Sequence, residues 1–215
     1  MRKTLSDDSF LNELTRLFLA EGVNGLTIGD IAARLRCSRR RLYAIAQTKE
    51  EIFCTAVDHF FQCVLDEGQA LSRKEPNLTA AIAAYLNVGV RAGRKMSVRF
   101  VKDMEESEPA RIKFDDFQRA RAIALAELID EGVQQGVFVP CHGLLVAELI
   151  LGAALRLRRP AFLAQAHLTI EEAFQELYRV LLGGLLVDAS APKKATASKK
   201  NKTQKDSVAD TASLN

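Results

Sequence analysis

The chain has 215 residues, of which 48% are hydrophobic and 27% are charged, and its formal net charge is +3 at pH 7. This is ordinary for a soluble globular protein, and no uncharged apolar run approaches the length of a membrane span. The first ten residues are too acidic for a secretory signal, and the four cysteines are scattered without a CxxC pair, so we expect free thiols and a cytoplasmic location.

The composition favours helices throughout. Ala and Leu are abundant, Pro is scarce, Trp is absent, and the alternating runs typical of strands are missing. The charge is unevenly divided: residues 1–50 hold nine Lys or Arg against six Asp or Glu, residues 51–187 hold 15 against 18, and residues 188–215 hold six against three. We therefore predict an all-α protein with a basic head and a mildly acidic body, which suits a polyanionic partner at one end.

Helical periodicity and capping residues predict about nine helices. Gly22 and Gly25 end the first helix, and Pro109 precedes the seventh. Thr169, with Glu172 three residues later, caps the ninth. The predicted helices span about residues 7–21, 28–35, 39–46, 49–71, 78–92, 97–106, 110–135, 144–157 and 169–186.

Residues 27–49 form the most informative stretch. Thr27 is a good N-cap with Asp30 at the capping-box position, and Ser38 caps the next helix after a short turn. Two short helices joined in this way make a helix-turn-helix, whose second helix can enter the major groove of DNA. A step of 100° per residue places Leu42, Ile45 and Ala46 inward. It places Arg39, Arg40 and Tyr43 outward, with Arg41 to one side. Taken alone, three consecutive arginines are also consistent with a solvated basic patch.

The pattern T-x-x-D-I-A-x5-S-x3-L-Y-x5-K-E-x-I, from Thr27 to Ile52, resembles the N-terminal signature of TetR-like (TetR/AcrR) transcriptional regulators. The motif likeness covers about residues 10–55. Arg36 replaces the usual turn glycine, so a positive φ is expected at a residue with a side chain. Ile45-Ala46 replaces a common aromatic pair, which thins the core beneath the recognition helix. The resemblance implies DNA contacts by Thr27, Ser38, Arg39, Arg40, Arg41, Tyr43 and Lys49.

The resemblance also implies an effector pocket in the body, with apolar walls that suit a small lipophilic or aromatic ligand. Simple core packing is the alternative for each lining residue. The basic stretch from Arg91 to Arg99 is consistent either with a solvated helix face or with a binding place for an anionic group. For His59 there are two interpretations: a polar residue on the helix surface, or a group that binds a ligand or senses protons. The candidate lining residues are Phe60, Tyr85, Met96, Phe100, Met104, Phe114 and Phe117.

The last two predicted helices are apolar on more than one side, which indicates a second partner. By the resemblance this partner is a second copy of the chain, and burial within one chain is the alternative. The tail at 188–215 is rich in Lys, Ser and Thr and is expected to be disordered, either as a solubilising extension or as an added attraction to DNA. The predicted dimer residues are Leu151, Leu155, Phe174, Leu177, Tyr178 and Leu181.

We therefore expect a helix-turn-helix DNA-binding domain at 1–48, a helical effector-binding and dimerisation domain at 49–187, and the tail beyond. The expected function is a ligand-released repressor that acts as a homodimer on a near-palindromic site in double-stranded DNA. The alternative is a module that organises DNA or answers to a partner protein, without a small-molecule effector. No catalytic motif, metal-ligand spacing or cofactor motif occurs, so neither an enzyme nor a cofactor is expected.

Overall fold

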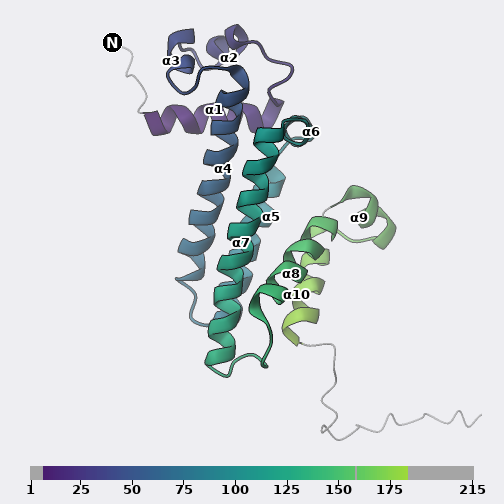
Figure 1. Cartoon of the computed structure of the whole chain (residues 1–215). Coiled ribbons are helices and arrows are strands. Elements are labelled where there is room, and N and C mark those ends of the chain that lie inside the picture. Colours follow the sequence, from purple (N-terminus) through teal and green to yellow (C-terminus); the bar gives the residue numbers. More distant parts are fainter. Residues whose placement is uncertain (1–6, 158, 184–215) are drawn as a thin grey trace, which may run out of the picture.

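The computed structural model describes residues 7–157 and 159–183, and within these ranges all regular structure is helical (Figure 1). The predicted all-α class is confirmed, while the predicted tail lies outside the described residues. We call α1–α3 the head and α4–α10 the body. The helices are α1 (Asp7–Glu21), α2 (Ile28–Arg34), α3 (Arg39–Tyr43), α4 (Lys49–Ser72), α5 (Leu78–Lys95), α6 (Val98–Glu106), α7 (Glu108–Gln134), α8 (Gly143–Leu157), α9 (Pro160–Ala166) and α10 (Ile170–Gly183).

The described residues contain ten helices where nine were predicted, because α9 was missed. Pro160 opens α9 in its first turn, where a helix does not use the missing N–H. His167 ends it in the left-handed conformation, with a φ of 53°. A helix of only seven residues is too short to show a clear apolar period.

Three helix boundaries within the described residues differ from the prediction by two residues or more. The recognition helix α3 ends at Tyr43 and not near residue 46, because the Ile45 N–H bonds back to Leu42 O (3.0 Å) in a tighter turn. α5 continues past Gly93 to Lys95, since a glycine costs a helix only about 1 kcal/mol and does not break it. α7 starts at Glu108 and takes Pro109 into its first turn.

The head and the upper body share one hydrophobic core. α1 lies across one end of the long helix α4, with α2 and α3 beyond it (Figure 1). Phe18 of α1 meets Phe53 of α4 edge to face, with ring centroids 5.5 Å apart, and Phe53 meets Phe100 of α6 at 5.6 Å. The same cluster of buried residues continues to Phe117 on α7 without a break. A displacement of α1 relative to α4 therefore has to be accommodated by closely packed rings.

A second core holds the lower body together. α4, α5 and α7 run side by side as long helices, and α8 packs along α7 (Figure 1). Leu86, Leu125 and Ile150, from α5, α7 and α8, are buried in this second cluster. Gly68 lets α5 approach α4 closely, since a Cβ there would lie 3.0 Å from a ring carbon of Tyr85. The Tyr85 hydroxyl donates to the carbonyl oxygen of Arg121 (3.3 Å).

The structure also describes the cysteines and the lengths of the apolar helices. All four cysteines fall within the described residues, and each is a free thiol. In the same part of the chain, every helix is too short or too polar to cross a bilayer.

Candidate nucleic-acid interface and ligand cavity

The first helix of the helix-turn-helix starts at the predicted capping box. The Asp30 N–H donates to Thr27 Oγ1 (3.1 Å), and the Thr27 N–H donates to Asp30 Oδ2 (2.9 Å). The Thr27 hydroxyl also donates to Asp30 Oδ2 (2.6 Å). This hydroxyl bond, followed by the backbone bond, lowers the pKa of the Asp30 carboxyl. The hydroxyl proposed to meet DNA is therefore engaged within the head.

The turn between α2 and α3 has the predicted strained residue. Arg36 has a φ of 51°, which is in the left-handed region. The glycine usual at this turn position adopts such a φ without steric strain. The Cys37 N–H donates to Ala32 O (2.9 Å), which closes the end of α2. A left-handed residue with a side chain costs about 1–2 kcal/mol, which the buried Ile31 and Leu42 on either side offset.

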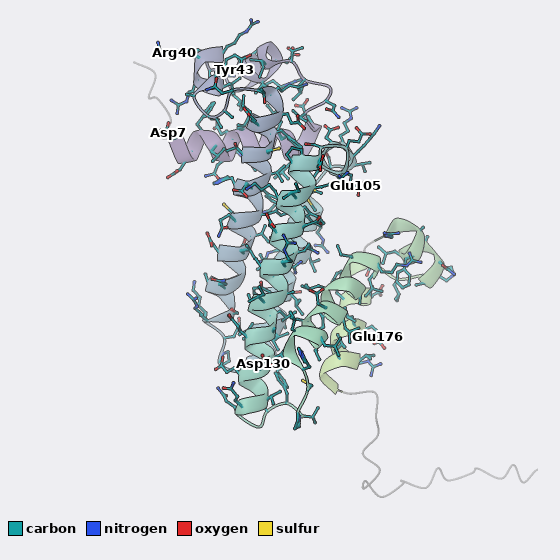
Figure 2. All side chains as sticks on the ribbon, viewed as in Figure 1. Asp7, Arg40, Tyr43, Glu105, Asp130 and Glu176 are labelled. Atoms are coloured by element: carbon teal, nitrogen blue, oxygen red, sulfur yellow. The ribbon has the colours of Figure 1, made fainter. Side chains whose placement is uncertain are left out.

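α3 is oriented by a single buried side chain. Leu42 is fully buried in the head, whereas Arg39 and Arg40 are exposed and Tyr43 is 45% exposed. Figure 2 shows Arg40 and Tyr43 at the end of the molecule formed by α2 and α3, far from Asp130 on α7. The Ser38 hydroxyl oxygen accepts the Arg41 N–H (3.3 Å), and such a hydroxyl can still donate its own hydrogen.

The guanidinium groups of the three arginines lie in different places. Arg41 is pinned to α1: its Nη2 lies 3.0 Å from Asp7 Oδ1, and its guanidinium carbon lies 4.6 Å from the Phe10 ring centroid. Arg39 folds towards the start of α2, where a Cβ added to Gly29 would lie 3.1 Å from its Nη2. The sequence predicted that Arg41 lies to one side of the exposed face of α3. In the structure Arg41 contacts α1, whereas Arg39 and Arg40 are exposed.

Lys49 also has partners inside the chain. Its ammonium group donates to the carbonyl oxygens of Val23 (3.2 Å) and Leu26 (2.9 Å) and so ties the α1–α2 loop to the start of α4. A phosphate contact by Lys49 remains a prediction, and the structure adds a bracing role that the sequence did not indicate.

The aromatic residues predicted to line an effector pocket are largely packed against one another. Phe60, Phe100, Met104 and Phe117 are buried, and Met96 and Phe114 are partly buried against the same cluster. The Phe61 and Phe117 rings stack with centroids 4.4 Å apart, which fills the space between α4 and α7. Tyr85 belongs to the other cluster.

A cavity of about 350 Å³ lies elsewhere, between α1, α4 and the end of α5. Of the seven predicted lining residues, only Phe60 borders it. Two sequence features pointed towards this place, because ligand contact was one of the two alternatives for His59 and for the basic stretch that ends α5. His59 and Lys95 both line the cavity. The polar residues that line the cavity are Asn12, Thr15, Arg16, His59, Glu67 and Lys95.

The predicted dimer residues differ in exposure. Leu151 and Phe174 are buried within the single chain, while Leu155 and Leu177 are partly buried and Leu181 is 37% exposed. The side chain of Tyr178 lies outside what the structure describes. Because Leu151 and Phe174 are buried, they leave little surface for contact with a second copy of the chain.

An apolar row on α8 is exposed in the structure, and the sequence did not indicate it. Leu145 and Leu149 are 59% and 60% exposed, and Gly152, three residues on, has open space where a Cβ would lie. These residues follow the i, i+4, i+7 spacing of one helix face. The signal was hidden because α8 is apolar nearly all round. Such a helix does not reveal from periodicity which side the body covers.

Within residues 7–157 and 159–183, no group of three or more His, Cys, Asp or Glu side chains is placed to hold a metal ion.

The fold has counterparts among solved structures. The fatty acid degradation regulator FadR from Bacillus halodurans matches with a TM-score of 0.66 at 15% identity, over 84% of this chain and 100% of that chain. A TetR-family transcriptional regulator from Syntrophomonas wolfei gives 0.62 at 19% identity, over 84% and 96%. The TetR-family regulator PfmR from Thermus thermophilus gives 0.59 at 21% identity, over 83% and 99%. No protein-family model and no curated protein matches the sequence. The similarities show that the chain has the TetR-like fold.

Proposed function

We propose that the chain is a TetR-type transcriptional regulator that binds double-stranded DNA through α3. The observation that carries the proposal is the arrangement of α3, in which buried Leu42 fixes the helix while Arg40 and Tyr43 stay exposed. An exposed arginine on a short, rigid helix can form a bidentate pair with guanine or contact phosphate.

The charge of the same stretch supports this assignment. Residues 27–49 hold six Lys or Arg and one carboxylate, Asp30. The carboxylate is already paired within the capping box, and Arg41 is paired with Asp7. The free positive charge is therefore concentrated on Arg36, Arg39 and Arg40, all of which are exposed. Such a cluster attracts the phosphate backbone and makes binding sensitive to salt.

We further propose a homodimer that uses the apolar row on α8 together with α10. Leu145, Leu149 and Leu181 leave a hydrophobic surface exposed on these two helices, which pack against each other. A twofold axis through this surface would present two copies of α3 to successive major grooves, about 34–36 Å apart on one face of DNA.

The regulator is proposed to be a repressor released by a small lipophilic or aromatic ligand. In this arrangement residues 1–48 bind DNA and residues 49–187 respond to the ligand. The support is the shared aromatic core, since Phe18, Phe53 and Phe100 join the head to the body. A ligand that prefers one arrangement of these helices shifts the DNA-binding equilibrium by its difference in affinity.

The test is selection of bound fragments from the source genome by the purified full chain, followed by footprinting. A discrete protected site with twofold symmetry is the expected result. Diffuse protection that does not depend on sequence would overturn the regulator and support the DNA-organising alternative. Absence of DNA binding at low salt would overturn both.

A further inference from the structure

The cavity between α1, α4 and the end of α5 has an apolar floor and a polar wall. Leu19, Phe60 and Val64 supply the floor from α1 and α4. At about 350 Å³ the cavity lies within the range of small-molecule sites and has room for a single aromatic ring with its substituents.

Thr15 marks the α1 side of the cavity. The residue is only 6% exposed, and its buried Oγ1 has no hydrogen-bond partner among the described residues. A buried hydroxyl without a partner is uncommon and destabilising, because folding removes its water without replacing it. A polar group inside this cavity would supply a partner if the side chain took the second of the two χ1 rotamers open to a helical threonine.

The polar wall continues onto α4. His59 Nε2 lies 2.9 Å from Asn12 Oδ1, which links α4 to α1 across the cavity, and Cys63 Sγ lies 3.7 Å from the same nitrogen. Both residues of the His59–Asn12 pair line the cavity. An occupant with a hydroxyl group would thus find donors and acceptors from both helices.

The rim carries more positive than negative charge. Glu67 is held by Arg91 (2.8 Å), and Glu13 lies 3.7 Å from Arg16. Lys95, the last residue of α5, adds a further cation to the lining. A carboxylate at the rim would meet Lys95, while Glu67 and Glu13 already have cationic partners in Arg91 and Arg16.

We propose that this cavity is a binding site for a small hydroxy-aromatic carboxylate. The ring packs on Leu19 and Phe60, the hydroxyl bonds with Thr15 and His59, and the carboxylate meets Lys95 at the rim. The site borders the packed aromatic cluster of the body at Phe60, whose ring centroid lies 6.3 Å from that of Phe100. It lies between α1, whose Phe18 belongs to the core of the head, and α4, which follows α3 in the chain.

Binding itself does not depend on the proposed function. One consequence does rest on it: an occupant that separates α1 from α4 would change the placement of α3 and so the affinity for DNA. The two parts are tested separately, first without DNA and then with it.

The first experiment titrates 4-hydroxybenzoate into the full chain and follows the histidine ring resonances by NMR. The chain has three histidines, so His142 and His167, which are outside the cavity, serve as internal references. Saturable shifts of His59 alone are expected. Benzoate, which lacks the hydroxyl, and 4-hydroxybenzyl alcohol, which lacks the charge, are expected to bind more weakly. No saturation by about 10 mM, a concentration that would detect even millimolar affinity, would overturn the site.

Variants then assign the two ends of the ligand. Lys95→Gln is expected to weaken 4-hydroxybenzoate binding by about threefold and benzoate binding similarly, since exposed charge pairs are worth less than about 1 kcal/mol. Lys102→Gln, an exposed lysine on α6 outside the cavity, is the matched control. Thr15→Val should weaken 4-hydroxybenzoate but leave benzoate unchanged, and Thr15→Ser should restore binding. Equal affinities in wild type, Lys95→Gln and Thr15→Val would overturn the proposal.

The second experiment adds the ligand to the DNA complex. A lower DNA affinity is expected in both proteins, and Lys95→Gln should need about three times the ligand concentration for half of the effect. Ligand binding without any change in DNA affinity would overturn the coupling but leave the site, whereas absence of DNA binding in any condition would overturn the proposed function alone.

Discussion

The carboxylate of Asp103 occupies the space that a side chain at Gly22 would need. Gly22 ends α1 with a φ of 73°, and a Cβ built there would overlap Asp103 Oδ2. The same oxygen accepts the N–H groups of Val23 (2.5 Å) and Asn24 (3.0 Å). α6 of the body thus binds the end of α1 through one buried carboxylate, and the Ser97 N–H adds a bond to Leu19 O (2.9 Å).

Replacing Asp103 with alanine is expected to loosen the head. Two backbone N–H groups would lose a charged acceptor, and we expect the free energy of unfolding to fall by about 2–3 kcal/mol. Hydrogen exchange should show faster exchange at Val23 and Asn24, and urea unfolding should give the loss of stability. Glu105→Ala, a change at an exposed carboxylate on the same helix, is the control. Unchanged protection of the Val23 amide would contradict the bracing role.

A methyl group at Gly22 should be costly for two reasons. The positive φ costs a residue with a side chain about 1–2 kcal/mol, and the Asp103 carboxylate would also have to move. Gly22→Ala is therefore expected to lower the melting temperature by several degrees, about 2–4 °C for each kcal/mol lost. Gly25→Ala in the same loop has open space around it and should change stability by less than about 0.5 kcal/mol. Equal melting temperatures for the two variants would rule out the clash.

The sequence was sufficient to predict the helices of the head, apart from the end of α3, because their signals are local. The capping box of Thr27 and Asp30, the inward Leu42 and the positive φ at Arg36 each depend on a few neighbouring residues. The all-α class and most helix boundaries follow for the same reason. The bracing of Lys49 against Val23 O joins groups 26 residues apart, and no local pattern predicts it.

The body was harder to predict because its features depend on tertiary packing. Aromatic residues such as Phe100 and Phe117 suit a pocket wall and a filled core equally well, and the structure packs them as core. Thr15 appears in the sequence as an ordinary helical threonine, and only the fold places it beside a cavity opposite His59. On α8, Leu149 and Leu151 are both leucines, and the contact with α7 decides that Leu151 is the buried one.

Arg40 and Arg41 should separate DNA binding from stability. Arg40→Ala is expected to weaken binding to the selected DNA site by about 1–3 kcal/mol, roughly fivefold to 150-fold, with little change in melting temperature. Arg41→Ala loses the pair with Asp7 and the contact with the Phe10 ring, so a lower melting temperature is expected.

Fluorescence anisotropy with labelled DNA and thermal unfolding measure the two effects. Arg73→Ala, at the opposite end of α4, is the matched control for loss of one exposed arginine. If Arg40→Ala kept wild-type affinity, α3 would not be the DNA-reading helix in the manner proposed.

The capping box should make the head sensitive to acid. The hydrogen bonds from Thr27 lower the pKa of Asp30 in the folded state, so the ionised carboxylate stabilises the fold above its unfolded pKa. This contribution is lost as the pH falls through the lower, folded pKa. The difference in stability between wild type and Asp30→Asn should therefore shrink as the pH falls from about 5 to about 2. Melting temperatures across this range measure it, and a constant difference would show that the Asp30 charge is not involved.

Leu149→Glu is expected to convert the proposed homodimer into a monomer. Leu149 is 60% exposed on α8, so the substitution leaves the chain's own core intact but places a charge in the apolar row. Burying an unpaired carboxylate at an interface costs several kcal/mol, enough to dissociate a typical dimer at micromolar concentration. Light scattering after size exclusion measures the mass, and the melting curve of the monomer verifies its fold. Val98→Glu, at an 87% exposed position on α6, introduces the same charge away from α8 and should remain dimeric. If both variants were dimers, the interface would have to lie elsewhere. If wild type were itself monomeric at all concentrations, the proposed twofold arrangement of the two α3 helices on DNA would fail with it.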